Sequence, residues 1–324
     1  EPDAVIASKV LGITLTKRSN GGAASAELAG FPHHALDTYL HKLVKAGYRV
    51  AICDQLEDPK TAKGIVKRGV TELVTPGVAL NDKLLENKTN NFLAALFLGE
   101  TEHGIAFLDI STGECLVAQG SLEYMDKLLQ SFQPSEVLVA KGKQRFFREH
   151  LDQKYYTFCL EDWIFQHLYA YENLIRHFDT QSLKGFGIED WHPAITAAGA
   201  ALHYLKDTEH PNLRHLTSIE RITAGDFLWM DRFTIRNLEL LHSPEDKGLT
   251  LLQTIDQTLT PMGARMLKRW LIFPLNHIPQ IEQRLEWVHI LIREQDLAGE
   301  INNQLKQIGD MEGLAAKISL RRIN

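Results

Sequence analysis

The stretch Phe92–Ala118, FLAALFLGETEHGIAFLDISTGECLVA, decides the fold class of this 324-residue chain. It contains three apolar runs, at 92–98, 105–110 and 114–118, and runs of this length between turn residues are typical of buried strands. Two more strand-like runs, 136–140 and 155–160, alternate with helices expected at 121–132, 163–178 and 194–206. Strands that alternate with helices predict an α/β layer architecture.

The segments on either side of this unit have different patterns. Residues 1–80 mix a strand at 12–16, a turn at Asn20–Gly22, a helix at 35–46 and a strand at 48–53. After 210 the chain is predicted to be almost wholly helical, with expected helices at 234–241, 250–258, 262–273, 278–293 and 297–318. We therefore predict a small mixed α/β domain (1–80), a linker (81–90), an α/β domain (91–210) and the first part of a helical domain (211–324).

Composition and charge narrow the class of protein. Apolar residues make up 44% of the chain, but the longest apolar run is far shorter than the roughly 20 residues that span a bilayer. Three widely spaced cysteines and no secretory signal predict a cytoplasmic chain with reduced thiols. The net charge of −6 is unevenly spread, at +2 for 1–80, −8 for 81–210 and zero for 211–324. The acidic total argues against a simple nucleic-acid-binding module.

Motifs for cofactors and metals give no site. Gly142-Lys143 lacks the upstream glycine of a phosphate-binding loop, and Gly185-Phe186-Gly187 lacks the third glycine of a dinucleotide loop. The adjacent pair His33-His34 has no acidic or thiol partner at metal-ligand spacing. We expect no catalytic residue, cofactor or metal in these 324 residues.

A group of carboxylates supports an alternative function, that of a metal-dependent, structure-specific nuclease with a ribonuclease-H-like domain. Asp109 lies in an apolar strand, and Glu114 and Glu136 lie on predicted neighbouring strands. Two-metal catalysis needs several such groups to converge. The competing interpretation, which we favour, is that Asp109 caps the turn at Ser111–Gly113.

Basic residues in the first domain point to nucleic acid. Lys17-Arg18 opens onto a glycine-rich loop, and Lys60, Lys63, Lys67 and Arg68 follow at near-helical spacing. Such cations supply sequence-independent affinity for phosphates. On charge alone, we favour the competing interpretation, that they form a solvated charged surface.

Specific strings resemble the MutS family of DNA mismatch-repair proteins. Three sets occur in the family's order, namely Leu11–Arg18, Leu28–His34, Val50–Pro59 and Val74–Gly77; then Leu108–Glu114; then Asn237–Leu240 and Thr258–Leu271. The resemblance implies a mismatch-recognition domain, a ribonuclease-H-like connector domain without nuclease activity, and part of a helical core. It also implies a parent protein that binds mispaired or looped DNA as a homodimer, in the bacterial cytoplasm at the nucleoid. In that parent, a DNA-dependent ATPase domain outside this chain would bind ATP and Mg.

The chain departs from the family pattern in three ways. The Phe-x-Glu wedge motif is expected upstream of Pro2, so we expect a truncated recognition domain. The one Phe-x-Glu here, Phe147-Arg148-Glu149, falls in the connector and is not interpreted as the wedge. The phosphate loop of the ATPase is absent, and Gly313 replaces an arginine that usually follows Asp310-Met311-Glu312.

Residue roles follow from the same resemblance. Lys17, Arg18, Leu28, Pro32 and His33 are expected to contact DNA, whereas Arg265, Lys268 and Arg269 either line DNA or form ion pairs within the core. The connector is expected to dock a MutL-type repair partner. A third possibility for the whole chain is a non-catalytic protein-binding adaptor.

Overall fold

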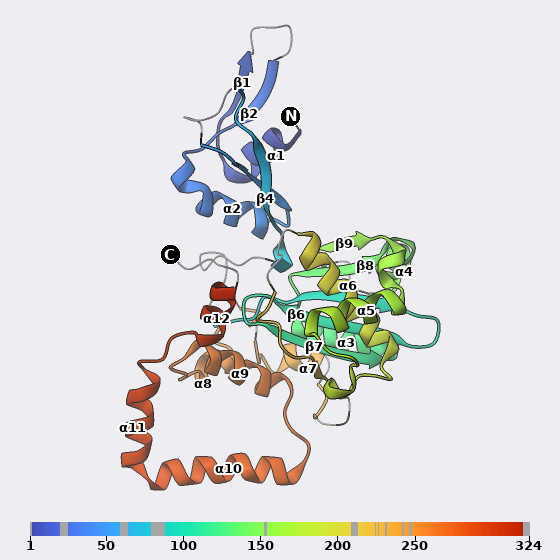
Figure 1. The fold of residues 1–324 in the computed structure, drawn as a ribbon. Helices are drawn as coiled ribbons and strands as arrows, with labels where there is room; N and C mark the ends of the chain where they lie inside the picture. Colours follow the sequence, from blue (N-terminus) through green and yellow to red (C-terminus); the bar gives the residue numbers. More distant parts are fainter. Residues whose placement is uncertain are drawn as a thin grey trace.

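The chain folds into three consecutive units, shown in the computed structural model in Figure 1. The structure describes residues 2–19, 25–58, 64–78, 88–151, 154–208, 213–223, 225, 227–230, 232–241, 243–245 and 248–319. The predicted turn at Asn20–Gly22, Lys60, Lys63 and most of the predicted linker (81–87) lie outside these ranges. We call the units the recognition unit, the connector and the helical core.

The connector is built on a six-stranded sheet with the order β10-β7-β6-β5-β8-β9. Its strands are β5 (Leu93–Leu98), β6 (His103–Asp109), β7 (Glu114–Gly120), β8 (Glu136–Ala140), β9 (Thr157–Leu160) and β10 (Glu220–Arg221). Its helices are α3 (Leu122–Phe132), α4 (Gln144–His150), α5 (His167–Phe178) and α6 (His192–Asp207). Strand β6 is antiparallel to both of its neighbours, and the other pairs are parallel. This order and direction are those of a ribonuclease-H-like fold, as predicted.

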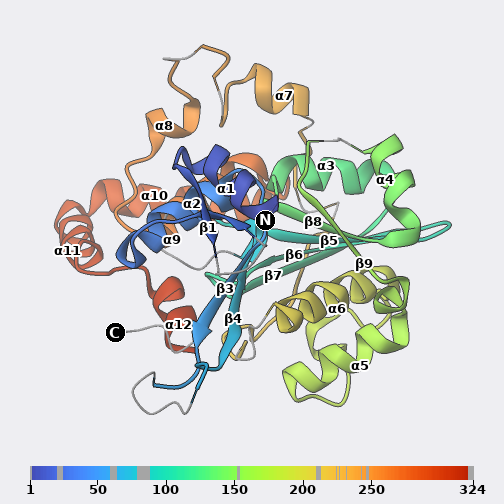
Figure 2. The ribbon, with the colours of Figure 1, turned by 90° about the horizontal axis from the view of Figure 1, so that it is seen from above.

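Helices cover both faces of the connector sheet (Figure 2). Along β5, Leu93 and Ala95 face the cluster that contains α5 and α6, whereas Ala94 and Leu96 face the cluster that contains α3. Because successive side chains of a strand point to opposite faces, a sheet buried on both sides requires a continuous apolar run. Gly104 permits close packing of α6, since a Cβ there would lie 2.1 Å from the backbone of Pro193.

The recognition unit is smaller and has two separate antiparallel ribbons. Its elements are α1 (Pro2–Leu11), β1 (Leu15–Ser19), β2 (Ser25–Ala29), α2 (Leu36–Lys45), β3 (Val50–Gln55) and β4 (Arg68–Val74), with short 3₁₀ turns at His33–Ala35 and Pro76–Val78. Strand β1 pairs with β2, and β3 pairs with β4. A small core of Leu40, Val44 and Val74 packs α2 against the second ribbon. Lys67 and Arg68 belong to the approach to β4 and its first residue, so the basic stretch is not helical where it is described.

The helical core consists of α7 (Arg232–Asn237), α8 (Leu251–Ile255), α9 (Pro261–Ile272), α10 (Ile278–Arg293), α11 (Gln295–Leu305) and α12 (Met311–Ser319). The prediction of one continuous helix over 297–318 is therefore wrong. Helix α11 ends at Leu305, and a separate helix, α12, begins at Met311. Helices α10 and α11 contain no buried residue and form an open frame away from the other units (Figure 1). The predicted fold class, mixed α/β units followed by a helical segment, is confirmed.

No helix in the described ranges is both long enough and apolar enough to cross a membrane.

Candidate nucleic-acid interface

The β1–β2 ribbon carries two of the predicted DNA contacts whose side chains are described, Lys17 and Leu28. Lys17 is exposed on β1 and lies directly opposite Glu27 on β2. Leu28 is 42% exposed and lies opposite Thr16, whose hydroxyl donates to the Leu28 carbonyl at 3.1 Å. Because neighbouring positions alternate between faces, Lys17 and Leu28 point to opposite sides of the ribbon. The backbone of Arg18 belongs to β1, and its side chain lies outside the described part.

The two other predicted contacts lie just beyond the ribbon. Pro32 caps the 3₁₀ turn that begins at His33, and both side chains are exposed. Phe31 supports this turn from inside, with its ring 4.6 Å from that of Tyr39 on α2. The structure thus gathers the four described side chains at the ribbon and the turn that follows it, but not on one flat surface.

A buried carboxylate fastens the recognition unit to the connector, and sequence reasoning assigned it no such role. Glu136 begins β8 and is 2% exposed. Its Oε2 accepts hydrogen bonds from the Thr75 hydroxyl (2.5 Å) and the Gly77 N–H (3.1 Å), and its Oε1 accepts from the Tyr204 hydroxyl (2.6 Å). Burial, and then the charge of Glu136, raise the pKa of Tyr204, so this hydroxyl remains a donor.

Aromatic contacts support the same junction. The guanidinium of Arg49, just before β3, lies 3.6 Å from the ring centre of Phe158 on β9, a cation–π geometry. The end of the recognition unit is therefore held to the connector sheet by polar and aromatic contacts together.

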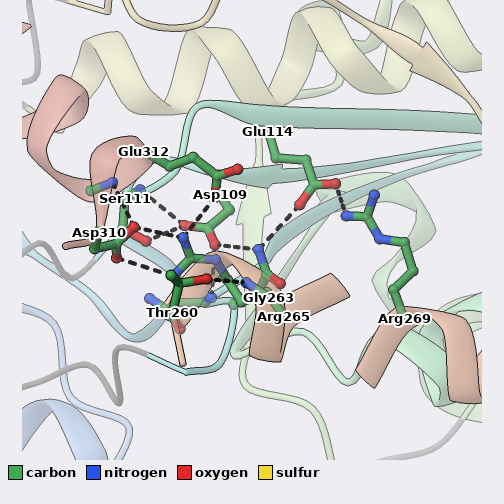
Figure 3. A network of polar contacts seen from close by, with 12 residues as sticks. Asp109, Ser111, Glu114, Thr260, Gly263, Arg265, Arg269, Asp310 and Glu312 are labelled. Carbon is green, nitrogen blue, oxygen red and sulfur yellow. Dashed lines mark hydrogen bonds and ion pairs between the residues drawn. The ribbon is translucent and has the colours of Figure 1, made fainter. Parts of the chain in front are cut away.

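The carboxylate of Asp109 is fully engaged by donors of the protein itself (Figure 3). Its Oδ1 accepts from the N–H and hydroxyl of Ser111, at 2.9 and 2.6 Å. Its Oδ2 accepts from Asn90 Nδ2 and from the Asn91 N–H, at 2.9 and 3.1 Å. The predicted turn cap is thus present. The carboxylates of Asp109 and Glu136 both accept hydrogen bonds that hold neighbouring segments of the protein together.

Glu114 connects the connector to the helical core. Its Oε2 accepts from Asn90 Nδ2 at 3.1 Å, and its Oε1 forms an ion pair with Arg269 of α9. Of the two roles considered for Arg269, DNA contact or ion pairing, the structure shows ion pairing, although the partner lies on β7 of the connector rather than within the core.

Arg265 forms an ion pair within the helical core, which is one of the two roles considered for it from the sequence. Its side chain is 7% exposed and donates to both carboxylate oxygens of Asp310 at 2.7 and 3.1 Å, and to Glu312 at 2.6 Å. Burial acts to raise the pKa of Asp310, but the hydrogen bonds from Arg265 and from the Gly313 N–H hold it below its usual value. Gly313 therefore still contributes to this cluster, through its backbone.

The Phe-x-Glu string of the connector has a structural role. Phe147 lies on α4, is 1% exposed and packs in the cluster on the α3 side of the sheet. A side chain buried in this way is not available to intercalate, in agreement with the interpretation from sequence.

The geometry defines a three-part chain in which one α/β connector joins a small ribbon-bearing unit to a helical core. Comparison with known protein families gives one match for each of the three parts. Residues 1–83 match MutS domain I, residues 91–217 match MutS domain II, and residues 233–324 match MutS domain III.

Similar proteins cover almost the entire chain. This chain is 57% identical over 322 residues to the "DNA mismatch repair protein MutS" of Cytophaga hutchinsonii, with 99% of this chain and 38% of that protein aligned. The proteins with the same name from Flavobacterium psychrophilum and Bacteroides fragilis are 56% and 52% identical, again over 99% of this chain and 37% of each relative. The chain belongs to the MutS family and spans less than two fifths of the length of these relatives.

Proposed function

We propose that this chain forms the recognition, connector and first core part of a protein that binds mispaired or looped duplex DNA. The observation that carries the proposal is the ordered match to three MutS domains, with an exposed ribbon in the first of them. In this proposal Lys17 and Arg18 approach the phosphates, and Leu28, Pro32 and His33 lie along the groove edge.

The recognition chemistry that we propose is the insertion of an apolar wedge into the minor groove of a kinked duplex. Unstacking costs less at a mispair, so a mispair is the easier place to kink. Within these 324 residues the one Phe-x-Glu is buried at Phe147. We therefore expect this chain to bind duplex DNA with little preference for a mispair.

The functions of the whole protein are proposals of the same kind. We propose that ATP and Mg bind outside these 324 residues, in a domain that makes the whole protein a DNA-dependent ATPase and a homodimer. The connector would dock a MutL-type partner, and the protein would act on the nucleoid in the bacterial cytoplasm. The matches to mismatch-repair proteins support this proposal.

Binding of a labelled duplex, followed by fluorescence anisotropy over a range of NaCl concentrations, tests the DNA interface. Lys17→Ala should weaken binding equally for paired and mispaired duplexes and reduce the salt slope by about 1. The matched control is Lys184→Ala, an exposed lysine of the connector, which should leave the slope unchanged. If both variants bind like the parent chain, the ribbon is not the DNA interface, and a protein-binding adaptor becomes the better account.

The residue opposite Lys17 provides a test in the other direction. Glu27 faces Lys17 across the ribbon, so its negative charge opposes the approach of a phosphate. Glu27→Gln should therefore tighten DNA binding, whereas an adaptor that binds only proteins would show no change in DNA affinity.

A further inference from the structure

The turn that Pro32 opens carries two of the proposed DNA contacts, Pro32 itself and His33. Two backbone hydrogen bonds close it, from the Ala35 N–H to the Pro32 carbonyl at 2.9 Å and from the Leu36 N–H to the His33 carbonyl. Both bonds lie within the turn, so they set its shape but not its direction relative to the β1–β2 ribbon. In this described segment, no side-chain hydrogen bond caps the turn at Pro32.

A pair of aromatic rings connects this turn to α2. Phe31 directly precedes Pro32, and its ring lies 4.6 Å from the ring of Tyr39, with an angle of 31° between the two planes. Both side chains are half-buried. Aromatic pairs at this spacing contribute more than their buried area alone. The ring contact therefore fixes the chain at the residue from which the turn starts.

Helix α2 is a firm support for Tyr39. The next residue, Leu40, and Val44 one turn later are each 5% exposed and pack with Val74 of β4 in the small core of the recognition unit. Lys42 Nζ lies 5.5 Å from the centre of the Tyr39 ring, a cation–π geometry within the same helix. Side chains carried by a packed helix hold their positions more precisely than those carried by loops.

We propose that Tyr39 is a positioning residue of the DNA interface. Through Phe31 it holds Pro32 and His33 in the direction in which they meet the edge of the groove, without touching DNA itself. This inference rests on the proposed function, because it assumes that the ribbon and the turn bind duplex DNA. The contact uses the ring of Tyr39 and not its hydroxyl, so a phenylalanine at position 39 should serve equally well.

Fluorescence anisotropy with a labelled duplex, over a range of NaCl concentrations, tests this role. Tyr39→Ala should weaken binding about two- to tenfold, the range expected for the loss of one aromatic pair. The salt slope should stay unchanged, because no phosphate contact is lost. Tyr39→Phe should bind like the parent chain. So should the matched control Tyr48→Ala, which removes a tyrosine of the same unit that is 39% exposed.

A double-mutant cycle with His33→Ala separates positioning from a general loosening of the recognition unit. If Tyr39 acts through the turn, His33 contributes less once Tyr39 is removed. The loss of affinity in the double variant should then be smaller, by about twofold or more, than the product of the two single losses. Single losses that simply multiply would overturn the proposal, and so would Tyr39→Ala binding like the parent chain.

Lys17→Ala in the same assay distinguishes this inference from the proposed function. If Lys17→Ala weakens binding and Tyr39→Ala does not, the positioning role alone is wrong. If neither variant weakens binding, the DNA interface itself is wrong. Should circular dichroism show that Tyr39→Ala unfolds the recognition unit, Phe31→Leu takes its place in the cycle with the same expected results, because it removes the same ring contact and keeps an apolar side chain.

Discussion

The buried carboxylate of Glu136 allows one prediction to be worked out from the structure. Glu136→Ala leaves three donors without an acceptor, on Thr75, Gly77 and Tyr204. All three residues are buried, so bulk solvent does not reach these donors in the folded parent chain. An unsatisfied buried donor costs about 1–3 kcal/mol, and removal of a buried charge returns part of that cost, so we expect a loss of about 3 kcal/mol in unfolding free energy.

Urea unfolding followed by circular dichroism measures this loss. With a slope of about 2 kcal/mol per molar urea, the midpoint of the connector transition should fall by roughly 1.5 M. Glu123→Ala is the matched control, because this carboxylate on α3 is 78% exposed and bonded only to Lys127 among the contacts described. The control should shift the free energy by less than about 0.5 kcal/mol.

Hydrogen exchange locates the effect at the junction. In Glu136→Ala the amides of residues 74–78 should lose protection more than those of α6, because the recognition unit is released from the connector there. A midpoint within about 0.3 M of the parent value would refute the inference that Glu136 carries this junction.

Further predictions concern the core, the histidines and the thiols. Arg265→Ala should cost about 2 kcal/mol in urea unfolding, less than a fully buried ion pair because Asp310 is partly exposed, whereas Arg145→Ala on the exposed face of α4 should cost almost nothing. Acidification from pH 7.5 to 5 should lower the thermal midpoint of the connector, because burial holds the pKa of several histidines below 6.5. As the pH falls, the unfolded chain takes up protons that the folded chain excludes, which favours unfolding. No such loss of stability is expected above about pH 7. The histidines concerned are His103, His167, His177, His203 and His215. A thiol reagent should modify exposed Cys53 rapidly in the native chain and leave Cys115 unmodified, because burial raises the pKa of Cys115 to about 12.

Apolar patterning was sufficient to predict the connector from the sequence. Its strands are buried on both faces, so they appear as continuous apolar runs that local reading detects. Strand β2 gave no such signal, because Ser25–Ala29 (SAELA) consists mainly of residue types that are not enriched in strands. Its pairing with β1 decides its conformation. The break before α12 was missed because the apolar spacing continues through Gly309 and Asp310, whereas Arg265 binds Asp310 from a distant helix.

The polar sites likewise divide into those with partners nearby in the chain, which were predictable, and those with distant partners, which were not. The cap formed by Asp109 involves Ser111, two residues away, and was predictable from local spacing. The partners of Glu136 lie 61 and 68 residues away in the chain, at Thr75 and Tyr204. No local pattern links such residues, and only the strand order of the sheet brings them together. The position of Lys17 opposite Glu27 likewise depends on a register that the sequence does not fix.

Photocrosslinking to duplex DNA tests the central claim most directly, namely that the β1–β2 ribbon is the surface that meets DNA. A benzophenone probe is attached at Leu28→Cys on the ribbon or at Leu168→Cys on the connector, two leucines that are 42% and 69% exposed. In a chain carrying Cys53→Ser and Cys159→Ser, the ribbon position should crosslink to DNA at least tenfold more than the connector position. Equal yields, or a higher yield from the connector, would contradict the account.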